Sequence, residues 1–346
     1  NPEAPELAHV RTRGASIAVD AAISNSFGFG GMDSVVLFEA ASAPARRRAE
    51  LSPRLFVSAA VPFVELESVD ARDSLDPERS RRFDRVTATS ARLAELALEK
   101  AGLRARDVGV VLGGAYGPVE RSLTFLDRIL SRGLKFAAPA EFPHLVNSAA
   151  TGNVSIYLRA RGPAVAVSAL GVSGEAAFDV ACSLAELGTT EAIVACALEL
   201  SDPVVTELFT KEHASSSPRG QGGAALLVET DGSWRRRGGA PLARVERVRA
   251  FRGAPSLLEF EFSGDAASSA VVFSEHTDEL FRAVEGSSWA NAARFRQDAH
   301  GYHEALGASA LAHAVSLIGA GKRRVLVLGA DSALTFAIEL ARPEEP

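Results

Sequence analysis

The sequence predicts an α/β protein whose sheets are covered on both faces by helices. Short apolar runs of strand length alternate with amphipathic helical stretches along most of the chain. Strands that read as continuous apolar runs are typical of sheets buried on both faces, whereas a sheet with one wet face shows alternation. The 346 residues suffice for a large core, and no run of 18 apolar residues would span a membrane.

The first predicted element is a pair of strands joined by a glycine-rich bend. Residues 17–23 and 34–39 have the composition of strands, and the segment between them contains Gly28, Gly30 and Gly31. The stretch that follows is rich in alanine, proline and charge, with little periodicity. We therefore expect a linker there.

The rest of the chain alternates strands with helices. Residues 84–103 predict an amphipathic helix, because apolar residues recur every three or four positions and Gly102 is suited to end it. Further strands are predicted at residues 55–64, 107–114, 164–170, 192–198, 222–230, 269–273 and 324–329. Further helices are predicted at residues 120–131, 142–160, 175–187 and 305–318.

Composition excludes several classes of protein. The net charge of −6 argues against a general nucleic-acid binder, and the N-terminal residues lack the apolar core of a secretory signal. Both cysteines, Cys182 and Cys196, lie in apolar stretches and are expected to be buried, reduced thiols. No Cys/His cluster has metal-ligand spacing, so we expect a cytoplasmic protein without a metal site.

Four stretches resemble the β-ketoacyl synthases of the thiolase-like superfamily. Residues 25–33 read NSFGFGGMD, similar to the family's C-terminal NSFGFGGTN, and residues 84–103 resemble its first long helix. Residues 136–200 resemble the region around the family's nucleophile, and residues 220–229, GQGGAALLVE, are similar to its GEGAAxLVLE. The resemblance implies a thiolase-like fold, layered α-β-α-β-α, with covered mixed sheets.

The order of these stretches predicts the domain organisation. Residues 1–46 resemble the C-terminal segment of one ketosynthase, and residues 47–53 are the expected linker. Residues 54–346 resemble a second synthase unit of the chain-length-factor type, shortened in its second half. Chain-length factors are the inactive partners of active synthases, so the resemblance implies a paired protein.

The family's nucleophile is missing from the second unit. The family pattern T-A-C-x-S-G aligns with residues 169–174, ALGVSG, which places Gly171 at the cysteine position. A cysteine at the start of a helix takes the acyl group as a thioester, whereas glycine has no side chain to acylate. The family's second histidine, in GHxxGA, aligns with Glu304, and His303 lies one residue early. No catalytic residue of the family is therefore expected in this unit.

The tail motif and one strand carry the remaining expectations. In the family the GFGG loop lies in the active site, so the resemblance assigns a partner's active-site loop to Asn25, Phe27, Gly28, Phe29, Gly30 and Gly31. In this superfamily the strand before the nucleophile pairs across the dimer. That resemblance assigns the interface to Ala164, Val165, Ala166, Val167 and Ser168.

These features predict a non-catalytic, chain-length-factor-like subunit of polyketide or fatty-acid biosynthesis. It would pair with an active synthase polypeptide that carries Cys-His-His, shape the acyl pocket and donate its GFGG loop to the partner. Acyl groups would arrive on the phosphopantetheine of an acyl carrier protein, and no cofactor would be bound. The alternatives are a thiolase-fold hydrolase or acyltransferase that uses Ser173, and a purely structural scaffold.

Overall fold

The computed structural model describes residues 18–28, 32–40, 53–67, 70–212, 218–261, 266–275, 277–298 and 301–344. They divide into two compact units, and the second contains every described residue from 53 onward. The predicted boundaries at residues 46, 47, 53 and 54 stay a prediction, because residues 41–52 lie outside the described ranges.

The first unit contains one antiparallel hairpin, formed by β1 (Ala21–Gly28) and β2 (Met32–Glu39). Ile23 lies opposite Leu37 on one face, and Val36 and Phe38 lie on the other. All four side chains are exposed. A lone two-stranded hairpin is marginally stable at best in water, so apolar residues on both faces indicate a hairpin that belongs to a larger sheet.

The second unit is built on one ten-stranded mixed sheet whose two halves have the same strand order. The first half runs β3-β7-β6-β4-β5 and the second runs β8-β12-β11-β9-β10. Only three residue pairs join the halves, where Leu55 to Val57 of β3 meet β8. The strands are β3 (Leu55–Pro62), β4 (Gly109–Gly113), β5 (Ala164–Val167), β6 (Ala192–Glu199), β7 (Gly222–Thr230), β8 (Ala243–Phe251), β9 (Ser269–Phe273), β10 (Ala293–Arg296), β11 (Arg324–Ala330) and β12 (Thr335–Ala341).

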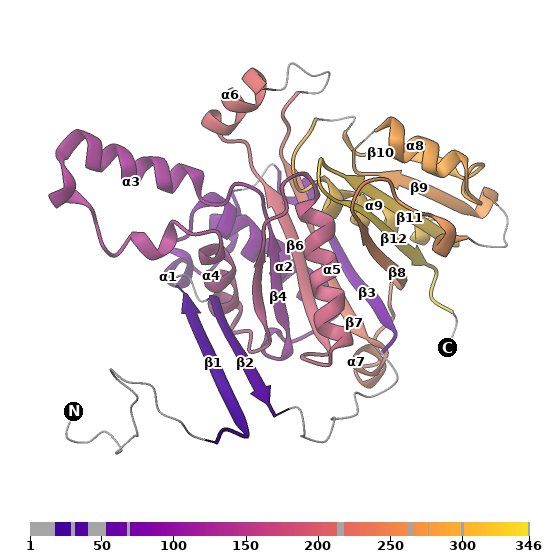
Figure 1. The fold of residues 1–346 in the computed structure, drawn as a ribbon, viewed down its shortest axis with the longest axis horizontal. Coiled ribbons are helices and arrows are strands. Elements are labelled where there is room, and N and C mark those ends of the chain that lie inside the picture. Colours follow the sequence, from indigo (N-terminus) through magenta and orange to yellow (C-terminus); the bar gives the residue numbers. More distant parts are fainter. Residues whose placement is uncertain are drawn as a thin grey trace. The chain divides into compact units, whose positions relative to one another are not determined.

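Helices cover both faces of the sheet and also fill the space between its halves (Figure 1). The central core cluster joins α5 and α9 to one face of both half-sheets, whereas α2 and α4 cover the outer face of the first half and α8 that of the second. This arrangement gives the layered α-β-α-β-α fold and confirms the predicted fold class. The helices are α1 (Pro77–Ser80), α2 (Arg85–Ala101), α3 (Val119–Arg132), α4 (Ser148–Leu158), α5 (Ser173–Glu186), α6 (Pro203–Glu212), α7 (Asp231–Arg236), α8 (Asp278–Glu285) and α9 (Leu306–Gly319).

Local sequence explains where the helices begin and end. Asp84 accepts a hydrogen bond from the Thr87 amide at 2.7 Å and so caps α2, and Gly102 ends that helix with a φ of 65°. The predicted helix over residues 142–160 divides into a short 3-10 turn (Phe142–His144) and α4. Among the described helices, none has the length and apolar content of a bilayer span.

Candidate functional site

The turn between β5 and α5, hereafter the elbow, is a strained strand-to-helix turn with glycine at position 171. Leu170 has a φ of 43°, in the left-handed region that leucine rarely occupies. The Ser173 hydroxyl donates to the Leu170 carbonyl at 2.8 Å and accepts from the Ala169 amide at 3.1 Å. Because this hydroxyl is fully buried and already bonded within the turn, the geometry does not favour Ser173 as a nucleophile.

Neighbouring side chains lie close to the place that a Cβ at position 171 would take. A Cβ built on Gly171 would lie 3.0 Å from the Tyr302 hydroxyl oxygen and 3.1 Å from the Asp331 Cβ. Asp331 is held in place because its carboxylate accepts the amides of Ala333 and Leu334, both at 2.8 Å. Two residues from the second half of the unit therefore crowd the elbow at Gly171.

Glu304, which the resemblance places near the family's second histidine position, forms a buried ion pair with Arg219. The Arg219 guanidinium donates two parallel hydrogen bonds to the Glu304 carboxylate, at 2.6 and 2.7 Å, and both side chains are almost fully buried. The guanidinium also lies over the rings of Tyr116 and Phe209. Phe209 stacks on Tyr302, so the ion pair and the group that fills the elbow form one packed cluster.

His303 is placed where it cannot readily take a proton. Burial, together with the neighbouring positive charge of Arg219, lowers the pKa of His303 to about 4. Among the described residues its Nδ1 has no hydrogen-bond partner, and its Nε2 lies 2.6 Å from where a Gly222 Cβ would be. The imidazole is therefore neutral and enclosed at physiological pH.

Three carboxyl groups near the elbow have raised pKa values. Burial raises the pKa of Glu199 to about 7, although this carboxyl accepts the backbone N–H of Ala115. Burial also raises the pKa of Glu275 to about 7, and the negative charges of Asp298, Asp331 and Glu304 raise it further.

The third of these carboxyls, Glu175, points from α5 into the core. The Ser274 hydroxyl donates to it at 2.6 Å, and burial raises the pKa of Glu175 to about 7. A Cβ on either Gly307 or Gly329 would overlap this carboxyl, so the two glycines make its space. In the described part of the chain, no three His, Cys, Asp or Glu side chains are placed to hold a metal ion.

The sequence pattern does not single out Arg219, Glu175 or Glu275 as site residues. Two of these residues have a feature in the sequence by which they could be found. Glu175 is a charge at the start of an otherwise apolar helix, and Arg219 directly precedes the glycine-rich stretch GQGG. The signal of Glu275 lies only in its position after the buried strand β9.

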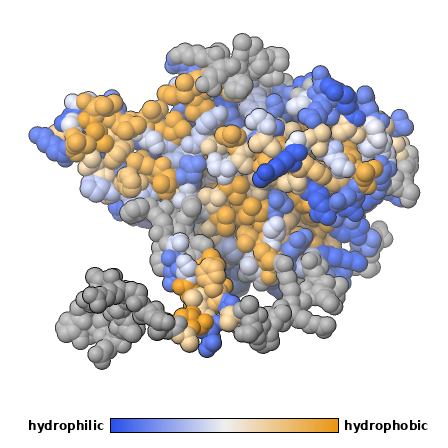
Figure 2. Space-filling model, in the orientation of Figure 1, coloured by the Kyte–Doolittle hydropathy of each residue, from blue (hydrophilic) through white to orange (hydrophobic). Residues whose placement is uncertain are grey.

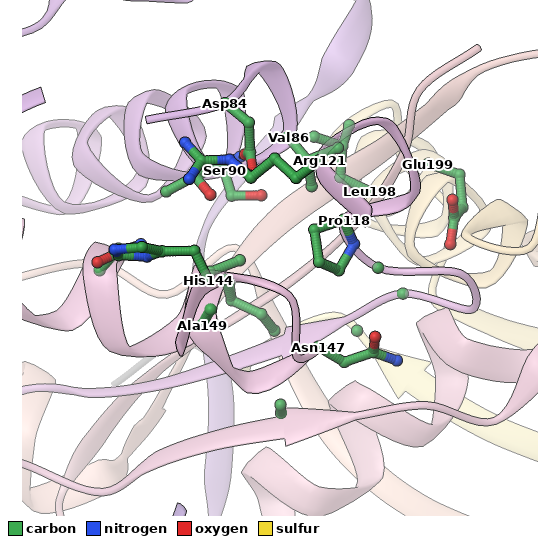
Figure 3. Close-up of a pocket in the computed structure, with 18 of the residues that line it drawn as sticks. Asp84, Val86, Ser90, Pro118, Arg121, His144, Asn147, Ala149, Leu198 and Glu199 are labelled. Atoms are coloured by element: carbon green, nitrogen blue, oxygen red, sulfur yellow. The ribbon is translucent and has the colours of Figure 1, made fainter. Parts of the chain in front are cut away.

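A pocket lies on the opposite side of β4 and β5 from α5 (Figure 3). Its cavity volume is about 50 Å³, and it opens to solvent. The close-up shows Asp84, Ser90 and Arg121 together at one end and Asn147 at the other. Arg121 Nε lies 3.0 Å from an Asp84 carboxylate oxygen, so an ion pair forms part of the wall.

The predicted interface residues lie along an edge of the sheet. Ala164–Val167 form β5, which ends the strand order and among the described strands pairs with β4 alone. Val165 and Val167 pack against the central core, whereas Ala166 and Val167 also line the pocket. Ser168 follows the strand, and its hydroxyl donates to the carbonyls of Gly114 and Ala115.

The predicted partner loop is only partly described. Asn25 lies exposed on β1, and the backbone of Phe27 and Gly28 completes that strand. Phe29, Gly30 and Gly31 lie outside the described residues.

Comparison with known proteins establishes the family. A profile described as beta-ketoacyl synthase, N-terminal domain, matches residues 61–239, which is more than half of the chain. The chain belongs to the β-ketoacyl synthase family. The resemblance on which the sequence analysis depends is thereby confirmed.

A curated relative is similar to a shorter stretch of this chain. The 3-oxoacyl-[acyl-carrier-protein] synthase 2 of Staphylococcus aureus (strain N315) is 28% identical over 135 residues. That match covers 38% of this chain and 33% of the relative.

Two solved structures share the fold of this β-ketoacyl synthase chain. One is a type II polyketide synthase acyl-carrier protein in complex with its ketosynthase bound to the hexaketide, with a TM-score of 0.72, 14% identity, and coverage of 84% of this chain and all of that one. The other is the PfaC keto synthase–chain length factor, with a TM-score of 0.70, 15% identity, and coverage of 94% of this chain and 47% of that one.

Proposed function

We propose that this chain is a non-catalytic, chain-length-factor-like subunit that pairs with an active β-ketoacyl synthase. The observation that carries the proposal is the elbow, where glycine stands at the aligned nucleophile position and the Tyr302 hydroxyl would lie 3.0 Å from a Cβ at residue 171. The Arg219–Glu304 ion pair then occupies the aligned histidine position. A carboxylate bound to arginine cannot assist decarboxylation as a histidine would.

The test is condensation by the purified chain with acyl and malonyl groups on acyl carrier protein. We expect no product from the chain alone and product when an active synthase with cysteine and both histidines is added. Condensation by the chain alone would show that the proposal is wrong. An acyl adduct on Ser173, detected by mass, would instead favour the hydrolase or acyltransferase alternative.

An exposed apolar surface supports pairing with a second synthase subunit. Figure 2 shows apolar residues gathered over the projecting helix α3. None of the residues of α3 is buried, although the helix has an apolar side. We define the pairing face as β5 together with six exposed side chains, which are Leu126, Leu130, Leu134, Phe136, Phe142 and Ile156. Apolar surface of this extent is unfavourable in water unless a partner covers it.

Charged substitutions on the pairing face test this surface. Leu130 and Ile156 are 84% and 76% exposed, so Leu130→Asp and Ile156→Asp should leave the chain folded. Each should abolish co-elution with the synthase, because an unpaired charge would be buried at the interface. Leu258, which is 80% exposed in the second half, provides a matched control as Leu258→Asp. Co-elution that survives both changes would place the interface elsewhere.

The hairpin β1–β2 supports donation of the GFGG loop to the partner's active site. Its apolar side chains are exposed on both faces, which is the pattern of a strand pair from the middle of a sheet. The match to the PfaC keto synthase–chain length factor covers a larger share of the chain than the second unit alone could supply. It therefore extends into the first fifty residues.

Phe29→Ala tests the donation. We expect the variant to assemble with the synthase but to show lower condensation or altered extender selectivity, because the family's second GFGG phenylalanine gates the acyl pocket. Turnover of the reconstituted complex is the measurement, and co-elution is the control. Unchanged turnover and selectivity would contradict donation.

A further inference from the structure

The ten-stranded sheet ends in two strands of the same kind, β5 and β10. Each is four residues long, runs parallel to its one neighbour among the described strands, and precedes a helix of the central layer. An edge strand presents backbone N–H and C=O groups with which a strand of another chain can pair. By backbone geometry, either end of the sheet could therefore take a neighbour.

The side chains of the two edge strands differ. β5 reads Ala-Val-Ala-Val, whereas β10 reads Ala-Arg-Phe-Arg. Residues two apart in a strand lie on the same face of the sheet, so Arg294 and Arg296 share one face. Phe295 lies on the other face, where it packs against the central core. The two arginines therefore lie on the outer face, on the side of α8.

Contacts within the second half-sheet hold both arginines along the edge. The Arg294 guanidinium lies over the Phe281 ring of α8 and 3.8 Å from a Glu285 carboxylate oxygen. Arg296 donates two hydrogen bonds to the Asp298 carboxylate, at 3.0 and 2.8 Å. The Arg296 side chain is 46% exposed and that of Asp298 only 7%, so an approaching chain would meet the positive group of this pair.

A second copy of the chain would bring arginine against arginine at the β10 edge. Copies related by a two-fold axis across a sheet edge pair antiparallel, and directly opposite residues then lie on the same face. In the registers centred on residues 294, 295 or 296, an arginine of one chain would lie opposite an arginine of the other. Like charges directly opposite each other are destabilising, and pairing would also remove the guanidiniums from water. At β5 the same operation brings alanine to alanine and valine to valine.

We propose that Arg294 and Arg296 close the β10 edge to a second copy of this chain, so that the sheet takes a neighbour only at β5. The proposal rests on the proposed function for the identity of that neighbour, and on the side chains of β10 for the rest. A sheet with two open ends would let paired chains join further into rows. A sheet with one open end stops at a single pair.

Sedimentation velocity of the complex with its synthase tests the proposal. The variant is Arg294→Val with Arg296→Val, and valine is a good strand former, so β10 should still form. Because the synthase would cover β5, we expect the variant complex to show a concentration-dependent species of twice the mass of the unmodified complex. Arg81→Val with Arg82→Val removes two exposed arginines outside the sheet and is the matched control, which should keep the single mass. A single mass in the variant, or doubling in the control as well, would overturn the proposal.

A charge exchange, Arg294→Glu with Arg296→Glu, tests the same edge without making it apolar. Glutamate would lie opposite glutamate in the variant alone, but opposite arginine in a mixture with the unmodified chain. We expect the doubled species only in the mixture, and we expect added salt to diminish it. A single mass in the mixture would contradict the arrangement of the arginines. Failure of the chain to co-elute with the synthase would contradict the proposed function alone, because the masses of the variant and unmodified chains by themselves still decide whether β10 is closed.

Discussion

Replacing Arg219 by methionine should be among the most destabilising single changes in this chain. Arg219 and Glu304 bury each other's charge, with 2% and 3% of their side chains exposed. Methionine would fill part of the space but leave the Glu304 carboxylate without its two hydrogen bonds. Removing one partner of a buried ion pair costs about 3–5 kcal/mol. Equilibrium urea denaturation of the full chain, at constant slope, measures the loss of stability.

The double variant Arg219→Met with Glu304→Leu separates the contribution of the ion pair to stability from that of packing. Replacing both charges by apolar side chains is often neutral, so we expect the double variant to recover most of the stability lost by the single one. Arg249→Met is the control, because Arg249 and Glu259 form a pair that is about half exposed on both sides, and it should cost under about 1 kcal/mol. A loss below about 1 kcal/mol in Arg219→Met, or no recovery in the double variant, would refute the reasoning.

Three further changes test the packing around the elbow. Gly171→Cys should not restore condensation or react readily with a thiol reagent, because the new side chain would meet Tyr302 and Asp331; turnover of labelled malonyl groups measures the first effect. Glu175→Gln should change the pH dependence of stability. The folded Glu175 carboxyl keeps its proton up to about pH 7, whereas the unfolded one keeps it only to about pH 4.5. The contribution of this carboxyl to the free energy of unfolding therefore falls as the pH rises through that range. Denaturation measured across the range should show a smaller fall in stability for the variant. Gly329→Ala should cost about 1–3 kcal/mol in thermal or urea unfolding, because its Cβ would overlap the Glu175 carboxyl, and a smaller loss would show that the carboxyl can move aside.

Apolar periodicity in the sequence predicts the buried strands of the fold well. The predicted strands at residues 222–230 and 269–273 coincide with β7 and β9, whose residues are all buried. The pattern does not predict β8, because that strand alternates valine with arginine and glutamate and is only half-buried. It also does not predict β12, whose Glu339 is a buried charge paired with Arg324 across the sheet.

Some residues of the candidate site are found from the neighbouring sequence, whereas others come together only in the folded chain. Gly171 is found from its neighbours in the chain, because the strand, turn and helix around it are contiguous. The Arg219–Glu304 pair joins residues 85 positions apart, and although Glu304 is found by alignment, nothing in the sequence pairs it with Arg219. Only the folded chain brings them together.

The strained backbone at Leu170 is held in place without any contribution from the residue at position 171. A leucine in the left-handed region costs about 1–2 kcal/mol, and its side chain is largely exposed, so burial returns little of that energy. What holds the turn is the Ser173 hydroxyl, which bonds to the backbone on both sides of Leu170 and makes no use of position 171. The elbow is thus independent of its nucleophile. A substitution at position 171 would therefore remove none of the hydrogen bonds that hold the turn, because neither of them involves that residue.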